Sequence, residues 1–161
     1  MLRTGLMTAL LAAGAIQGAL AQPAFQPRRA PQFAPLVERA CLPLMRGGTV
    51  SQAVENARPL AFAFLAKNAT QATVQRDENF TTTFGPRSCF ITLAYADAGF
   101  FPAVESELRA FLPRLGRYWA GAIEPDAMGL RYRKYRAGGF TFVLEEQIDE
   151  HSRRLNLTVG P

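Results

Sequence analysis

The residues best suited to chemistry lie close together near the carboxyl end of the sequence, in the stretch LRYRKYRAGGFTFVLEEQIDEH at positions 130–151. This stretch begins with basic residues and tyrosines, passes through a Gly-Gly pair, and ends with acids and the only histidine of the chain, His151. Such a composition is suited to binding a polyanion or to acid–base catalysis, and it is also typical of an ordinary β-hairpin.

The basic half of the stretch predicts a binding surface. The residues concerned are Arg131, Arg133, Lys134, Tyr135 and Arg136. Charged and aromatic groups of this kind bind phosphate, acidic glycans or acidic protein surfaces. A half-buried hairpin explains the pattern without a ligand, because strand alternation then puts Arg131 and Arg133 on its solvent face. The alternation is lost near Tyr135, which is compatible with a bulge that turns this tyrosine toward solvent.

The acidic half contains candidates for acid–base chemistry, namely His151 with Glu146 or Asp149. A carboxylate beside an imidazole fixes its tautomer and raises its pKa, which prepares a general base. However, the sequence has no GxSxG nucleophile motif, and one histidine with carboxylates does not match the spacing of known zinc motifs. We therefore expect a solvated charged turn, no bound metal and no cofactor.

Aromatic residues form a third candidate site around the clearest predicted helix, which lies between Gly99 and Gly116. Phe100, Phe101, Tyr118 and Trp119 flank this helix, and packing between helix and sheet explains them. Trp119 has an alternative role as the flat wall of a cleft for an apolar or sugar ligand.

Residues 1–21, MLRTGLMTALLAAGAIQGALA, predict a secretory signal peptide. They contain one early arginine, an uncharged apolar run at 5–16 and an Ala-Leu-Ala cleavage pattern. The apolar run is shorter than the ~20 residues that a permanent membrane helix needs. Sixteen of the 18 basic residues are arginine, a bias typical of GC-rich bacterial genomes. We therefore expect a periplasmic or secreted bacterial protein with no membrane span after cleavage.

The remaining chain suits one domain. Residues 22–33, QPAFQPRRAPQF, have three prolines and no apolar period, which predicts a flexible lead-in before a single domain at 34–161. After loss of residues 1–21 the chain keeps 17 basic and 13 acidic residues, a net charge of +4. Acids are spread through both halves of the sequence, so a nucleic-acid partner is not expected.

The two cysteines, Cys41 and Cys89, predict one intramolecular disulfide, because an exported protein enters an oxidising compartment. Closing a loop of this length removes unfolded-chain entropy equivalent to about 4 kcal/mol. Two buried thiols are the alternative.

Apolar periodicity predicts helices and strands in a clear order. A helix over 34–45 buries Cys41, and a second follows the capping-box pattern Thr49-Val50-Ser51-Gln52. The run 60–66 is either strand or helix. Strands are predicted at 72–76, 79–84 and 88–96, and three or four more after Gly116, in the runs 117–123, 129–136, 139–147 and 153–159.

This order predicts an α+β fold in which about three helices pack on one face of an antiparallel sheet of about six strands. It also suggests a helix-plus-meander unit used twice, although no residue-level repeat supports that idea. The expected function is that of a small, non-catalytic binding or accessory domain of the cell envelope, favoured as a monomer, whose partner is an envelope protein or an acidic ligand. The alternative is an envelope hydrolase or lyase that uses His151 with a nearby carboxylate.

Overall fold

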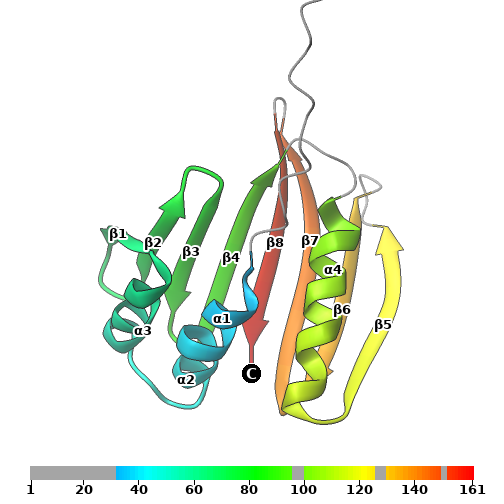
Figure 1. The fold of residues 1–161 in the computed structure, drawn as a ribbon, viewed down its shortest axis with the longest axis horizontal. Coiled ribbons are helices and arrows are strands. Elements are labelled where there is room, and N and C mark those ends of the chain that lie inside the picture. Colours follow the sequence, from blue (N-terminus) through cyan, green and yellow to red (C-terminus); the bar gives the residue numbers. More distant parts are fainter. Residues whose placement is uncertain (1–31, 96–99, 126–129, 150–151) are drawn as a thin grey trace, which may run out of the picture.

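The computed structural model describes residues 32–95, 100–125, 130–149 and 152–161. In these residues an antiparallel sheet of eight strands, ordered β1-β2-β3-β4-β8-β7-β6-β5, carries its helices on one face (Figure 1). The predicted α+β class and antiparallel sheet are confirmed. The predicted count of about six strands is wrong, because the sheet has eight.

Each half of the described chain is a helical segment followed by a four-stranded meander. The first half contains α1 (Ala34–Leu36), η1 (Val37–Cys41), α2 (Leu42–Met45), α3 (Val50–Ala57), η2 (Arg58–Leu60), β1 (Ala63–Lys67), β2 (Ala72–Asp77), β3 (Phe80–Gly85) and β4 (Ser88–Tyr95). The second contains α4 (Phe100–Phe111), η3 (Leu112–Leu115), β5 (Tyr118–Pro125), β6 (Arg131–Ala137), β7 (Phe140–Asp149) and β8 (Ser152–Gly160). The last strands of the two meanders, β4 and β8, pair at the centre of the sheet.

The strand count was too low because the edge strand β1 carries a weak sequence signal and because only three or four strands were expected after Gly116. Periodicity alone did not decide whether the run 60–66 is helix or strand. In the structure its first residue, Leu60, is the last residue of η2, and residues 63–66 form most of β1. Ala61 lies between them in the left-handed conformation (φ 65°). All residues of β1 are exposed, so this strand shows none of the alternation that marks a half-buried strand.

Local signals fix the first helices. Segments α1, η1 and α2 run on continuously. The wide π-helical turn of η1 ends at Cys41, two residues before Pro43, which has no N–H to donate to the preceding turn. The predicted capping box opens α3: the Thr49 hydroxyl accepts from the Gln52 amide at 3.1 Å, and the Gln52 side chain accepts from the Thr49 amide at 2.9 Å.

The predicted disulfide is confirmed. Cys41 and Cys89 are bonded, with 5.5 Å between their Cα atoms, and both are fully buried. The bond joins η1 to β4 on the face of that strand that also carries Ile91 and Leu93. It therefore ties the first helical segment to the core side of the sheet.

The hydrophobic core lies between the helices and the sheet. Fully buried side chains on the sheet include Val74, Phe84, Ile91, Leu93, Phe142, Leu144, Leu155 and Leu157, and those on the helices include Leu36, Val37, Val104 and Leu108. Burial of each large apolar side chain stabilises the fold by about 1.5–3 kcal/mol. Among the described residues, no helix is long and apolar enough to cross a membrane.

Candidate functional site

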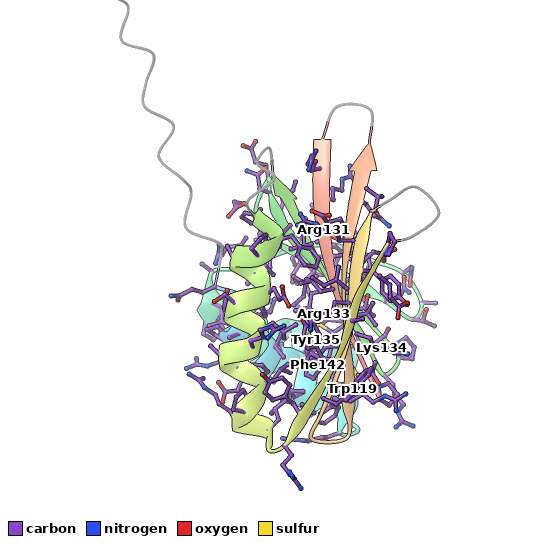
Figure 2. All side chains as sticks on the ribbon, turned by 90° about the vertical axis from the view of Figure 1, so that its right-hand side faces the viewer. Trp119, Arg131, Arg133, Lys134, Tyr135 and Phe142 are labelled. Atoms are coloured by element: carbon purple, nitrogen blue, oxygen red, sulfur yellow. A yellow bond between two sulfur atoms is a disulfide. The ribbon has the colours of Figure 1, made fainter. Side chains whose placement is uncertain are left out.

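Strand β6 carries all five residues of the predicted basic surface, and its pleat divides them between two faces. β6 pairs with β7 from Tyr132 to Ala137 without a shift of register, so successive side chains point to opposite sides. Arg133 and Tyr135 lie between the sheet and α4, whereas Lys134 lies on the other side of the strands (Figure 2). The five residues therefore form two groups, and the side of the sheet without helices is called the helix-free face below.

Arg133 and Tyr135 bind a carboxylate that α4 supplies. Oε1 of Glu105 accepts from Arg133 Nη1 at 2.7 Å, from Tyr135 Oη at 2.9 Å and from Arg109 Nε at 3.0 Å. Arg133 also donates from Nε to the Gly121 carbonyl at 2.7 Å. Only 16% of the Arg133 side chain and none of Tyr135 is exposed. The expectation that Arg133 lies on the solvent face was therefore wrong, and the unbroken register of β6 from Tyr132 to Ala137 has no bulge that would turn Tyr135 toward solvent.

The charges of this cluster are set by its contacts. Burial alone would raise the pKa of Glu105, but hydrogen bonds from Tyr135 and Arg109 and the charges of Arg109 and Arg133 outweigh it, so the pKa is lowered. Burial, with the hydrogen bond to Glu105 and its negative charge, raises the pKa of Tyr135. At neutral pH Glu105 is ionised and Tyr135 is neutral, so the cluster serves as a fixed link between α4 and β6.

Arg131 and Glu146 form a second ion pair on the same side of the sheet. Arg131 donates from Nε to Oε2 and from Nη2 to Oε1 of Glu146, each at 2.7 Å. The arginine also lies over the ring of Phe101 in α4, 4.7 Å from its centroid. Glu146 is 5% exposed. Both oxygens of this candidate base are therefore engaged by a cation that the sequence had assigned to the solvent side.

The side chains of the other two candidate acid–base residues lie outside the described part of the chain. His151 lies outside the described residues. Asp149 ends β7, and its side chain also lies outside the part of the chain that is described. A partnership of Glu146 or Asp149 with His151 stays a prediction. Within the described ranges, no three His, Cys, Asp or Glu side chains converge in a way that could hold a metal ion.

The helix-free face brings Trp119, Lys134 and Arg136 together, and these three residues are called the Trp119 surface. Trp119 of β5 is paired in register with Arg136 of β6, whose guanidinium lies 6.0 Å from the centroid of the indole. Trp119 is 56% exposed, and both cations are exposed. The prediction that Trp119 packs between helix and sheet was therefore wrong.

A glycine makes room for this arrangement. A Cβ atom on Gly121 would lie 2.9 Å from Cη2 of Trp119 and 3.3 Å from the carbonyl oxygen of Lys134. The indole therefore lies over the backbone of its own strand. The register of β5 shifts between Ala120 and Ile123, which marks a bulge at this point.

Several polar side chains elsewhere on the helix-free face bind one another. Thr73 and Thr83 share a hydrogen bond of 3.0 Å between their hydroxyls, and the Thr92 hydroxyl donates to the side-chain oxygen Oδ1 of Asn156 at 3.1 Å. Tyr132 donates to Glu124. By contrast, no described carboxylate lies within salt-bridge distance of Lys134 or Arg136. The Trp119 surface is thus a cationic and aromatic end of a face that also carries these polar side chains and the exposed ring of Phe90.

Sequence reasoning missed the partners that orient these residues. Glu105 directly follows the buried Val104 in α4 and lies four residues after the buried Phe101. An acid at the border of this apolar stripe was the available signal for a carboxylate that points toward the sheet. Gly121, two residues after Trp119 within a strand, was a second signal, because glycine in a strand often marks a bulge or a close approach.

No protein-family model matches this chain, and no curated protein sequence matches it significantly. Its own geometry is therefore the basis for any assignment of function.

Proposed function

We propose that this chain is a non-catalytic binding domain that captures an acidic protein surface through the Trp119 surface. The signal peptide that the sequence predicts at residues 1–21 leads us to propose export, with an accessory role in the cell envelope. The partner would then be an envelope protein with carboxylates beside an apolar contact.

The observation that carries this proposal is the stacking of Arg136, a cation with no carboxylate partner among the described residues, on the exposed indole of Trp119. The guanidinium of Arg136 lies over the ring of Trp119. Lys134 precedes Arg136 by two residues and lies on the same face of β6. An exposed cation–π contact contributes about 0.5–1 kcal/mol, too little to explain an exposed tryptophan by stability alone. Tryptophan and arginine are also the residues that most often dominate the energy of protein interfaces.

Charge complementarity favours an acidic partner. The two cations have no described carboxylate partner, and the chain as a whole has a formal net charge of +5. An acidic surface would pair with both cations and cover the indole, which removes apolar area from water.

The hydrolase alternative gains no support from Glu146, because Arg131 binds both oxygens of this carboxylate. Arg131 and Arg133 are also unsuited to a test of binding, since reversing their charges would break the pairs with Glu146 and Glu105. Lys134 and Arg136 avoid that difficulty.

The experiment is crosslinked affinity capture from an envelope extract, at low and at physiological salt. Wild type is compared with Lys134→Glu/Arg136→Glu and with Trp119→Ala. The matched control is Arg39→Glu/Arg87→Glu, which makes the same change of charge at two exposed positions elsewhere. We expect a partner that both Trp119-surface variants lose, that the control keeps, and that binds wild type more weakly as salt increases.

Capture that the Lys134→Glu/Arg136→Glu variant retains would overturn the proposal, as would equal loss in the control. Loss of a measurable hydrolytic activity in His151→Ala, with partner capture unchanged, would support the enzyme instead.

A further inference from the structure

A second surface lies at the opposite edge of the sheet, where α3 meets β1. A groove of about 170 Å³ opens there, and its apolar lining is Val50, Val54, Phe64 and Ala72. Sites for drug-sized ligands occupy roughly 300 Å³ or more. The groove is therefore better suited to one apolar side chain than to a cofactor or a substrate.

The strand beside this groove is an edge strand with an apolar surface. β1 is the end strand of the sheet order and pairs with β2. Phe64 is 52% exposed and Leu65 is 54% exposed. Edge strands offer free backbone N–H and C=O groups, and natural proteins usually protect them with charges, prolines or bulges. In β1 only two features offer such protection: a shift of register at Leu65, and the charge of Lys67 at the end of the strand.

We propose that β1 and this groove form a docking site for an extended segment of another protein. The segment pairs with β1 as an added strand and places one apolar side chain between α3 and Phe64. An acidic residue of the segment lies against Lys67. Strand addition of this kind takes affinity from backbone hydrogen bonds and specificity from the pocket for the side chain.

The charges around the groove favour an acidic segment. Its charged lining residues are Glu55, Arg58 and Lys67, which leaves a net positive charge. Glu55 already lies 3.3 Å from Arg58, so Lys67 is the cation left to an incoming carboxylate. The exposed apolar strand β1 and the cation Lys67 thus both favour an extended segment that carries an apolar and an acidic residue.

A second copy of this chain fits the site less well. Antiparallel pairing of two β1 strands about Leu65 would put Lys67 of one copy opposite Ala63 of the other. β1 contains no acidic residue, so this pairing would offer Lys67 no carboxylate. The formal net charge of +5 also makes two copies repel one another.

The test is selection of a phage-displayed random peptide library against the oxidised protein, followed by fluorescence anisotropy with the selected peptides. We expect peptides that combine apolar and acidic residues, and whose affinity falls about tenfold with Phe64→Lys. Lys67→Glu should weaken binding, and replacing the acid of the peptide by lysine should restore it. Methylation of alternate backbone amides of the peptide should abolish binding through loss of hydrogen bonds.

The control separates this site from the Trp119 surface. Lys134→Glu/Arg136→Glu should leave binding of the peptides unchanged, so that failure of one proposal is distinguishable from failure of the other. A library that yields no binder, or binders indifferent to Phe64→Lys and Lys67→Glu, would overturn the docking site. Sedimentation showing a wild-type dimer that Phe64→Lys dissociates would overturn it in favour of a second copy.

Discussion

The two halves of the sheet have the same order of elements but hold their helices by different means. In the first half, Cys41 and Cys89 join the helical segment to β4 covalently, and α3 packs through Ala53, Val54 and Ala57. In the second half, α4 combines an apolar row with the Glu105 carboxylate, which binds Arg133 across the interface.

The comparison shows that two helix-on-sheet layers with the same order of elements can depend on different conditions for their stability. A disulfide constrains the unfolded chain at any pH, whereas a carboxylate link depends on its ionisation. A buried ion pair also fixes geometry, since Glu105 must reach both Arg133 and Tyr135 at once. We therefore expect the first half to respond to loss of the disulfide and the second half to loss of one charge.

Loss of the disulfide should have the largest effect on stability. Cys41→Ala/Cys89→Ala frees a loop closed over 48 residues, which lowers the free energy of unfolding by about 4 kcal/mol. Urea unfolding of the variant and of the oxidised wild type measures the difference. Hydrogen exchange should show the greater loss of protection in α1, α3 and β4, with α4 less affected. Equal loss in α4 would mean that the two halves unfold as one unit, and the comparison would fail.

Loss of the Glu105 charge should have the next largest effect. Glu105→Gln keeps the shape of the side chain but leaves the part-buried guanidinium of Arg133 without a carboxylate, at a cost of about 2 kcal/mol. The matched control is Glu38→Gln, because Glu38 lies 3.7 Å from Arg114 in a pair whose side chains are both more than half exposed. That change should cost less than about 1 kcal/mol. Similar losses in urea unfolding would show that α4 is held by apolar packing alone.

Acid should distinguish Glu105 from Glu107, its neighbour on the same helix. The pKa of Glu105 is lowered in the folded protein, so its stabilisation is present above the unfolded pKa and is lost as pH falls through the folded pKa. The difference in stability between wild type and Glu105→Gln should therefore stay constant from pH 7 down to the unfolded pKa of glutamate, about 4.3, and shrink below it.

Glu107 should show the opposite sign. Burial raises its pKa, although hydrogen bonds from the amides of Ala34 and Phe33 partly offset this. Burial of the charge costs stability above the folded pKa, and that cost disappears as the carboxyl is protonated. Glu107→Gln should therefore become less favourable relative to wild type as pH falls. The same slope for both variants in urea titrations would contradict this assignment.

Much of the fold could be predicted because its signals are local. The capping box at Thr49 and Gln52 and the helical position of Cys41 were each sufficient to place an element and its buried side. Edge strand β1 could not be placed in the same way, because its residues are all exposed and its period carries no information about burial.

The candidate site was predicted less well because its orientation depends on distant residues. The alternation of Arg131, Tyr132 and Arg133 was read correctly, but not its continuation through Tyr135 nor which side of β6 faces the helices. That choice depends on Glu105, 28 residues before Arg133, and on Glu146, 15 residues after Arg131. An arginine on a buried face is stable only where such an acid meets it, and no local pattern shows that meeting.

The smallest effect on stability should come from Gly121→Ala, which acts on the Trp119 surface in the second half. The added methyl group would overlap Cη2 of Trp119, and the indole is exposed enough to move away. Unfolding free energy should change by less than about 1 kcal/mol.

Fluorescence makes this displacement visible, because Trp119 is the only tryptophan in the sequence. We expect Gly121→Ala to change the emission of Trp119 and to weaken partner capture while stability is nearly preserved. Gly160→Ala is the matched control, because a Cβ there would meet nothing within 4 Å. Unchanged emission with unchanged capture would mean that the position of the indole over Gly121 does not matter for binding. A change in emission with capture intact would leave the two cations, Lys134 and Arg136, as the determinants of the Trp119 surface.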